Sequence, residues 1–415
     1  MAGKVLIICR SYYPHYGPQA HRAGKFAKYL KKFGWEPVIL CSESTPQNDA
    51  MFDAKLIGQD VCRTIRVPYN ISAANRSFNF LVRKMLKHLS LEVLQFLSPR
   101  RLYYNVLARA DKLLQEEKFD VILATTPAPF ALAIADKMSR KYHIPWIADY
   151  RDIPAQHKSK LNPCSPYHLL IKAHQKCCSS AGALITVSQP LYDKLKKWHQ
   201  KTIYLIFNGY DPDDYHKEIK SNSEYFTLVY CGTIHDSANP GILLDALDFI
   251  LKKDPRQLER FRILIYGVPQ YRFHRLFAQR PCSQLFHCKG RVSFSESIRA
   301  QQEATALLFL AYPEVAGIMT AKIFEYLGAG RPILSVPGDI GVTDDILAET
   351  QAGMPASSPQ QTSKILLNWI DQWRNTGKVN YQALPEKIQA YTREKQTEQL
   401  AQILEKAVAG HFKTA

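Results

Sequence analysis

The chain has 415 residues, of which 46% are hydrophobic and 22% charged, and this balance is typical of a globular protein and excludes disordered and low-complexity classes. At this length a single hydrophobic core is unfavourable, so two domains are expected. The net charge of +17 predicts an anionic partner, such as nucleic acid, an acidic membrane face or a phosphorylated substrate.

Membrane-spanning and secreted classes are not indicated. The longest run without a charged residue, 177–192, is shorter than the ~20 residues of a spanning helix. The apolar run Val5–Cys9 is too short for the ~7–15-residue core of a signal peptide and is better interpreted as a buried first strand. The nine cysteines include no C-x-x-C pair, which favours free thiols in a reducing cytoplasm and indicates no metal site.

In the first half of the chain, short apolar strands alternate with amphipathic helices. Val5–Cys9 is a predicted strand, His21–Phe33 a helix with its basic residues, Arg22 among them, around its polar side, and Pro37–Cys41 the next strand. This is a βαβ unit, which builds a parallel sheet with a right-handed crossover. Further strands are predicted at 120–125, 145–149, 183–187 and 203–207, around helices at 131–142 and 190–199.

A second series of the same kind follows a polar segment, 211–225, that shows no periodicity. Its predicted strands are 227–231, 262–266, 306–309 and 332–336, with helices at 242–252, 297–303, 321–327 and 363–375. One final helix is predicted at 386–408. Two consecutive βαβ series predict an α/β fold of two Rossmann-like lobes, with a ligand cleft where the carboxyl ends of the strands face each other.

A loop rich in Tyr, Pro and Gly, residues 13–18, joins the first strand to the first helix. In open parallel sheets this position binds phosphates or sugars through backbone N–H groups at the helix N-terminus. The loop lacks the spaced glycines of a dinucleotide fingerprint, so a nicotinamide cofactor is not expected. A plain turn without a ligand is the alternative.

Two carboxylates flank an arginine at the end of the predicted strand 145–149. Asp149, Arg151 and Asp152 stand where catalytic or substrate-orienting groups of α/β enzymes usually lie. A structural Asp–Arg ion pair without chemistry is the alternative.

The segment 320–333, TAKIFEYLGAGRPI, is the most specific in the chain. Thr320 begins a short predicted helix whose free N–H groups and dipole can hold a phosphate. Glu325 lies about one and a half turns deeper, where a carboxylate can accept hydrogen bonds from a ribose diol. An amphipathic helix with a glycine C-cap is the structural alternative, but it does not explain why Lys322 and Glu325 interrupt the apolar side.

These segments together resemble a known family. The string TAKIFEYLGAGRPIL is similar to the donor-binding signature of retaining GT-B glycosyltransferases, specifically glycosyltransferase family four. Other segments resemble parts of that family in the expected order: KVLIICRSYYPHYGPQAHR, FDVILATTPAP, IPWIADYRDIP, AGALITVSQPL, IFNGYDPDDY and YCGTIH. The resemblance covers nearly the whole chain and is weak only over residues 45–115.

The resemblance implies a GT-B fold, in which two Rossmann-like lobes face a central cleft and a C-terminal helix packs back on the first lobe. Residues 1–208 are the expected acceptor-side lobe, 209–385 the nucleotide-sugar lobe and 386–415 the returning helix. The implied activity is transfer of a hexosyl or related group from a nucleotide-diphosphate sugar, with retention of configuration and without metal or cofactor. The expected acceptor is a lipid-linked or growing surface-glycan saccharide.

Matching positions imply the site residues. The expected donor-binding residues are Gly17, Gly232, Thr233, Thr320, Lys322 and Glu325. Gly17 would let the backbone approach the donor phosphates, the N–H groups after Thr320 would meet the diphosphate, and Glu325 would bind the ribose hydroxyls. The expected catalytic residues are Asp149 and Asp152, facing the acceptor and the transferred sugar, together with Glu325.

Two positions depart from the family pattern. The family often has paired glutamates, but Gly317 stands eight positions before Glu325, where the second one belongs. Many members also carry an Arg and a Lys after the first strand of the second lobe, where this chain has only His235. The candidate replacements for these cations are Lys322, Lys289 and Arg291.

A basic amphipathic segment, 77–99, indicates an anionic membrane surface as a partner. Its apolar residues at helical spacing are Phe78, Val82, Met85, Leu89, Val93 and Phe96, and its off-stripe cations are Arg83, Lys84, Lys87 and His88. With the net charge, this segment favours a peripheral location at the inner face of the membrane and suits a lipid-linked acceptor. A core helix with a solvated basic side is the alternative.

Other functions are compatible with parts of the pattern. A nucleotide-sugar epimerase of the same fold would bind a similar donor without an acceptor. A catalytically degenerate sugar-nucleotide-binding protein is motivated by Gly317 and by the missing Arg/Lys pair. Nucleic-acid binding is indicated by charge alone and is not expected, because basic and aromatic residues are not interleaved in a recognisable motif.

Overall fold

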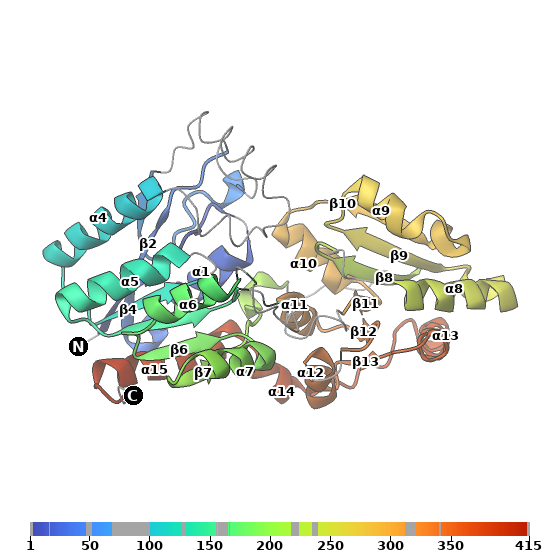
Figure 1. The fold of residues 1–415 in the computed structure, drawn as a ribbon. Helices are drawn as coiled ribbons and strands as arrows, with labels where there is room; N and C mark the ends of the chain where they lie inside the picture. Colours follow the sequence, from blue (N-terminus) through green and yellow to red (C-terminus); the bar gives the residue numbers. More distant parts are fainter. Residues whose placement is uncertain are drawn as a thin grey trace. The chain divides into compact units, whose positions relative to one another are not determined.

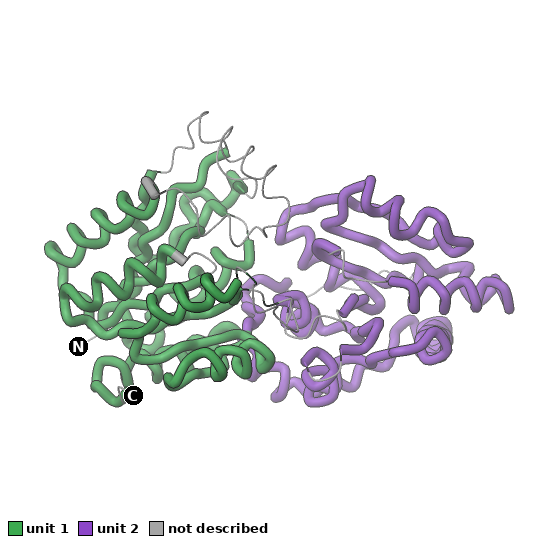
Figure 2. Tube along the Cα trace, viewed as in Figure 1, with its two compact units in different colours: residues 1–207, 393–415 green, residues 208–392 purple. Residues whose placement is uncertain are grey.

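The computed structural model describes residues 3–15, 17–46, 52–68, 100–126, 129–154, 156, 165, 167–216, 224–234, 240–311, 320–339 and 342–412. The chain forms two compact units (Figure 2), the first of Met1–Phe207 with Arg393–Ala415 and the second of Asn208–Thr392. We call them the first and second lobe. The predicted amphipathic segment 77–99 lies outside the described residues, as do His235 and Gly317.

A parallel sheet forms the centre of the first lobe (Figure 1). Its strands in the described residues are β1 (Gly3–Ile8), β2 (Trp35–Ser42), β3 (Arg63–Val67), β4 (Val121–Thr125), β5 (Trp146–Tyr150), β6 (Ala183–Thr186) and β7 (Ile203–Leu205). They lie in the order β3-β2-β1-β4-β5-β6-β7, and each neighbouring pair is parallel. Strands β4 and β5 are buried along their whole length, since helices cover both faces of the sheet.

Different helices pack on the two faces of this sheet. The described helices of the first lobe are α1 (Pro18–Leu30), α4 (Arg100–Glu116), α5 (Pro129–Tyr142), α6 (Tyr167–Cys177), α7 (Gln189–Trp198) and α15 (Arg393–Val408). Val5 and Ile7 of β1 pack with α1 and α15, while Leu6 and Ile8 pack with α4, α5 and α7. The alternation follows from the pleat, which points successive side chains to opposite faces.

The C-terminal helix α15 belongs to the first lobe, although the second lobe precedes it in the chain (Figure 1). Leu400 and Leu404 are fully buried in one cluster with Phe26 and Leu30 of α1. The predicted return of the C-terminal helix to the first lobe is therefore confirmed.

The prediction of one helix over 386–408 is wrong. The structure has α14 (Pro385–Gln389), a break at 390–392 and then α15. Tyr391 is held in the second lobe, where its ring lies 5.5 Å from that of Phe324 and its hydroxyl donates to the Glu349 carboxylate. The helix breaks because the chain passes from one lobe to the other at this point.

The second lobe repeats the same plan. Its strands within the described ranges are β8 (Phe226–Cys231), β9 (Phe261–Tyr266), β10 (Phe286–Gly290), β11 (Ala306–Phe309), β12 (Ile333–Ser335) and β13 (Gly353–Pro355). All neighbouring pairs are parallel, in the order β10-β9-β8-β11-β12-β13. Numbered from the first strand of each lobe, both sheets share the Rossmann order 3-2-1-4-5-6.

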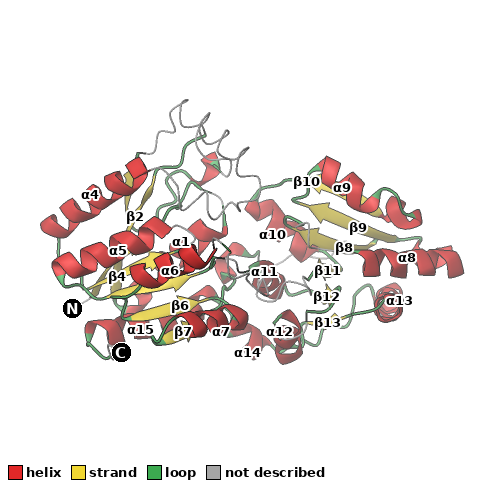
Figure 3. Ribbon diagram, viewed as in Figure 1, coloured by secondary structure: helices red, strands yellow, loops and turns green. Residues whose placement is uncertain are grey.

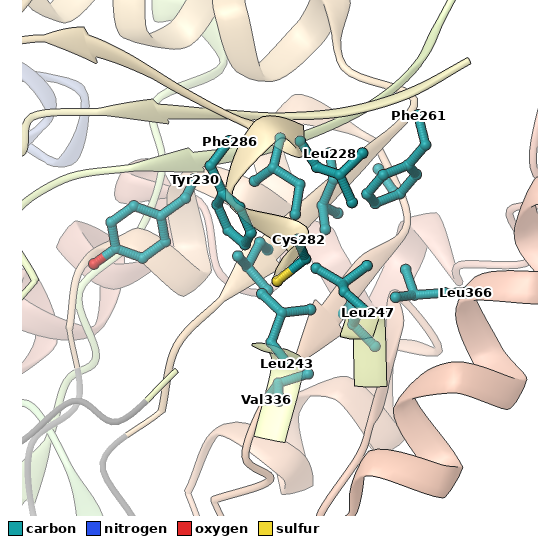
Figure 4. Close-up of a cluster of buried hydrophobic side chains, with 14 of the residues drawn as sticks. Leu228, Tyr230, Leu243, Leu247, Phe261, Cys282, Phe286, Val336 and Leu366 are labelled. Carbon is teal, nitrogen blue, oxygen red and sulfur yellow. The ribbon is translucent and has the colours of Figure 1, made fainter. Parts of the chain in front are cut away.

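Helices pack on this second sheet around one apolar cluster (Figure 4). The described helices, besides α14, are α8 (Gly241–Lys253), α9 (Gln270–Phe277), α10 (Phe294–Glu303), α11 (Lys322–Ala329), α12 (Thr343–Thr350) and α13 (Pro359–Thr376). Leu247 of α8 and Leu366 of α13 meet the strand residues Leu228 and Phe261 in this cluster. Figure 3 shows strands between helices in both lobes, so the predicted α/β class with two Rossmann-like lobes is confirmed.

No helix in the described part of the chain has both the length and the apolar character that crossing a bilayer demands.

Candidate functional site

Each sheet reverses its strand order once, between β1 and β4 in the first lobe and between β8 and β11 in the second. Loops that leave neighbouring strands at such a switch point run to opposite sides of the sheet, and ligands of open α/β folds bind in the crevice between them. Gly232 and Thr233 follow β8, and Thr320 and Lys322 lie between β11 and the body of α11. The donor residues predicted in the second lobe therefore lie at its switch point.

Gly232 adopts a backbone conformation that side chains disfavour, with φ of +120°. A Cβ atom there would also lie 2.2 Å from Cε of Lys322. Its N–H donates to the carbonyl of Tyr266 at 3.0 Å, and the left-handed Gly267 packs directly against it. A glycine is required at 232 by the backbone angle and by the lysine that crosses above it.

Lys322 links the start of α11 to the loop after β8. Its Nζ donates to the hydroxyl of Tyr230 at 2.6 Å and to the carbonyl of Thr233 at 3.0 Å. The Tyr230 hydroxyl lies apart from the apolar cluster that holds the tyrosine ring (Figure 4), so that it reaches the lysine. Burial lowers the pKa of Lys322 to about 8, against the raising effect of Glu325 and Cys231.

The N-terminus of α11 carries groups that can donate to an anion. No side chain caps this end of the helix, and Oγ1 of Thr320 is buried without a hydrogen-bond partner among the described residues. Uncapped N–H groups and the helix dipole favour negative charge at this position. Glu325 lies one turn into α11, half-buried, and its main-chain carbonyl accepts from the Tyr215 hydroxyl at 2.8 Å.

The three candidate replacement cations lie in different places. Lys322 contacts the β8 loop directly. Lys289 lies on β10, two strands away from β8, and Arg291 follows that strand. Among these three, Lys322 is therefore the cation at the switch point.

In the first lobe, Gly17 precedes α1 at the switch point, with Pro18 in the first helical turn. A Cβ atom at Gly17 would lie 2.7 Å from Nε2 of His15. The loop thus packs tightly around the start of α1, whose first turn has no side-chain cap.

Asp149 is buried near the end of β5 and forms a bidentate ion pair with Arg22 of α1. Nε and Nη2 of Arg22 donate to its two carboxylate oxygens at 3.0 and 2.9 Å, and the Thr125 hydroxyl donates at 3.0 Å. Arg22 also donates to the carbonyls of Ile206 and Phe207 after β7. The pair therefore joins α1, β5 and the end of the sheet.

The placement of Arg22 on the polar side of its helix is wrong, since its side chain is 1% exposed. Sequence reasoning did not assign it to the site either. The available signal was its position one turn before Phe26, whose ring the guanidinium covers at 4.6 Å.

Asp152 is more accessible than Asp149, with 39% of its side chain exposed. Its carboxylate accepts from Nε2 of Gln156 at 3.0 Å. The hydroxyl of Thr126 accepts the N–H groups of Arg151 and Asp152 at 3.0 and 3.3 Å, which fixes the turn after β5. Asp149 and Asp152 thus lie on one turn, but only Asp152 has substantial contact with solvent.

In the ranges that the structure describes, no group of three or more His, Cys, Asp or Glu side chains is arranged to hold a metal ion.

Part of the chain matches a known protein family. Residues 19–214 match the family described as Glycosyltransferase Family 4. No curated protein sequence matches the chain.

Solved structures match over nearly the whole length. HepE of Anabaena, in complex with UDP and glucose, is 14% identical with a TM-score of 0.64, covering 97% of this chain and 99% of that one. Sucrose-phosphate synthase from Thermosynechococcus elongatus is 14% identical with a TM-score of 0.66, covering 98% and 100%. A glycosyltransferase from Rickettsia africae is 13% identical with a TM-score of 0.61, covering 98% of each chain. At these identities the likeness establishes the fold, which is of the GT-B type.

Proposed function

We propose that the protein is a glycosyltransferase that moves a sugar from a nucleotide-diphosphate sugar to an acceptor, with retention of configuration and without a metal. The observation that carries this proposal is the switch point of the second lobe, where Lys322 and the uncapped start of α11 meet the β8 loop. The match of residues 19–214 to a glycosyltransferase family supports the reaction class.

The donor is proposed to bind at this switch point. Lys322, the Thr320 hydroxyl and the first N–H groups of α11 hold the diphosphate, and Glu325 binds the ribose hydroxyls. Gly232 and Thr233 form the wall beside the phosphates. HepE is known in complexes with UDP and with UDP-glucose, which supports a uridine diphosphate sugar as the first donor to test.

The chemical role of these groups follows from where charge develops. Cleavage of the bond between the sugar and the diphosphate places negative charge on the departing phosphate oxygens. A fixed ammonium and oriented N–H groups stabilise that charge without reorganisation, which is usually the largest single catalytic contribution. Glu325 also raises the pKa of Lys322, which favours the charged form that this role needs.

In the first lobe we propose that Asp152 contacts the acceptor and the transferred sugar. The sequence predicts a catalytic role for Asp149 as well. Its carboxylate is buried and already binds Arg22 and Thr125, so we propose a positioning role for it, which holds the turn that carries Asp152.

The acceptor is proposed to be a lipid-linked or surface-glycan saccharide that the protein meets at an anionic membrane face. The support is the net charge of +17 and the basic segment 77–99, which lies outside the described residues. Flotation with liposomes tests this location. Protein that stays at the bottom of the gradient, with and without anionic lipid, contradicts it.

Donor binding is tested by thermal unfolding with UDP, GDP, ADP and dTDP, each alone and as sugar conjugates. A ligand at ~100 times its dissociation constant stabilises the folded state by ~2.7 kcal/mol, and we expect this shift with the uridine series. Glu325→Ala should abolish most of the shift and of the sugar transfer while the protein stays folded. Lys289→Gln is the matched control and should behave as the wild type.

The outcomes separate the alternative functions. Transfer to an acceptor supports the proposal, whereas conversion of the donor sugar without an acceptor identifies an epimerase. Binding without turnover identifies a degenerate sugar-nucleotide-binding protein. Undiminished sugar transfer by the Glu325→Ala variant would show that Glu325 does not bind the donor.

A further inference from the structure

Arg151 is a buried cation whose hydrogen-bonding capacity is largely unused. Its side chain is 10% exposed, and Nε and Nη1 have no hydrogen-bond partner within the described residues. The Asp152 carboxylate lies 4.0 Å from Nη2, beyond hydrogen-bonding distance, and accepts from Gln156 instead. The other nearby carboxylate, Asp149, accepts two hydrogen bonds from Arg22.

Such an arrangement is costly for a protein that needs nothing bound there. Removing a guanidinium from water without supplying acceptors is strongly unfavourable, and a buried charge normally has a close partner. Arg22 in the same lobe differs, since its side chain is 1% exposed and it donates to a carboxylate and two carbonyls. The groups that would satisfy Arg151 are oxygen acceptors with negative charge.

The surroundings of Arg151 are cationic as well. The pKa of His21 on α1 is lowered to about 3, mainly by burial and also by the charges of Lys25, Arg393 and Arg151. A neutral His21 adds no charge at physiological pH, and the cations that act on it include Lys25, Arg393 and Arg151. Arg22 contributes no net charge, since Asp149 neutralises it. Among the described residues that act on Arg151, the negative charge that is not neutralised is that of Asp152, whose side chain is 39% exposed.

We propose that Arg151 is the ligand of an oxyanion site in the first lobe, which takes a phosphate or carboxylate group of the acceptor substrate. The planar fork of a guanidinium matches such groups with two parallel hydrogen bonds. Thr126 fixes the turn that presents the arginine, and Asp152 on the same turn lies beside the bound group. The assignment to the acceptor rests on the proposed glycosyltransferase function, whereas the oxyanion site itself does not.

The experiment measures binding of two probes, inorganic phosphate and glucuronate, to the full chain by isothermal titration calorimetry. Titrations are carried out on Lys322→Met protein, so that phosphate binding in the second lobe does not contribute. Adding Arg151→Met should weaken binding of the preferred probe at least tenfold, and Arg151→Lys should weaken it less, because the charge remains without the fork. Arg140→Met, which removes a surface arginine of the same lobe, is the matched control and should change nothing.

The two probes identify the source of the anion. Preference for phosphate indicates a phosphorylated or diphosphate-linked acceptor, and preference for glucuronate indicates an acidic sugar. Absence of saturable binding of both probes, or equal binding with and without Arg151→Met, overturns the proposal.

Thermal stability without ligand distinguishes binding from a structural role. Because Arg151 is buried without acceptors, Arg151→Met should unfold at the same temperature as the wild type or higher. A large fall in the unfolding temperature of both Arg151→Met and Arg151→Lys would identify a structural arginine and overturn the proposal.

Kinetics test the assignment to the acceptor. Arg151→Met should raise KM for an anionic acceptor and leave the KM and binding of the donor unchanged. Loss of UDP binding in this variant would place Arg151 in the donor site instead. If the protein binds no nucleotide but retains phosphate binding that depends on Arg151, the glycosyltransferase proposal fails while the oxyanion site stands.

Discussion

Three buried or half-buried cations lie in the candidate sites of the two lobes, and their partners differ. Arg22 has a carboxylate and two carbonyls, Lys322 has a hydroxyl and one carbonyl, and Arg151 has a single carboxylate at 4.0 Å. A cation whose hydrogen bonds are all accepted by the protein stabilises the fold, whereas a cation with unused donors is available to a ligand. We therefore assign Arg22 to stability and the other two cations to ligands.

Asp149→Asn should destabilise the first lobe by about 3–5 kcal/mol, because it leaves Arg22 buried opposite a neutral amide. Urea denaturation measures the change. Thr125→Val is the matched control, since it removes one hydrogen bond to the same carboxylate and should cost about 1 kcal/mol. A variant Asp149→Asn that is fully stable but inactive would instead support the catalytic role predicted from the sequence.

Donor affinity should fall as the pH rises through about 8. Lys322 is charged below its pKa of about 8 and neutral above it, and only the charged form attracts a diphosphate. UDP binding measured between pH 6.5 and 9.5 should weaken by about thirtyfold over this window, equivalent to ~2 kcal/mol. Lys322→Met should bind weakly at every pH, and a pH dependence that survives in this variant would assign the titration to another group.

At the scale of elements, β8 and α11 form the proposed donor site only because the sheet brings them together. The strand pair β8 and β11 places the β8 loop beside the connection to α11, and Gly232 leaves room for the Lys322 side chain. The strands that the sequence did not predict lie at the sheet edges, where β3, β10 and β13 are short and partly exposed. Edge strands need no continuous apolar run, and β13 even ends at Pro355.

Gly232→Ala should both strain the backbone and displace Lys322. The φ of +120° costs a non-glycine residue about 1–3 kcal/mol, and the new methyl group would occupy the place of Cε of Lys322. Thermal unfolding should show the loss of stability, and the shift produced by UDP should shrink as well. Gly34→Ala, at a φ of +77° with open space around it, controls for backbone strain and should leave UDP binding intact.

On the scale of the whole molecule, the second lobe is an insertion in the first. The chain leaves the first lobe after Phe207 and returns at Arg393, so α15 completes a core that begins with β1. This explains why 386–408 breaks into two helices, one for each lobe. The stability of the first lobe therefore depends on the last residues of the chain.

Leu404→Ala should destabilise the first lobe by about 2–5 kcal/mol, since this leucine of α15 is fully buried in the cluster that includes Val5 and Ile7 of the sheet. Denaturant unfolding measures the loss. Glu405→Ala, one residue further and exposed, is the control and should change the stability by less than about 0.5 kcal/mol. Equal stability of the two variants would contradict the role of α15 in the first core.

The sequence by itself determined the local elements and their class. Buried parallel strands are continuous apolar runs, and the ten predicted strands each overlap a strand of the structure, with ends that differ by two residues or fewer. It also located the turn at 149–152 and the start of α11 as candidate sites, because ligands of this fold gather at the carboxyl ends of strands.

Only the tertiary structure decided which of these groups meet. Arg22 pairs with Asp149 across 127 positions, and Lys322 reaches Thr233 across 89. The helix boundary at 390–392 likewise depends on which lobe each half packs against. Local sequence sets burial and periodicity, but contact between distant segments depends on strand order, and that order is a property of the complete sheet.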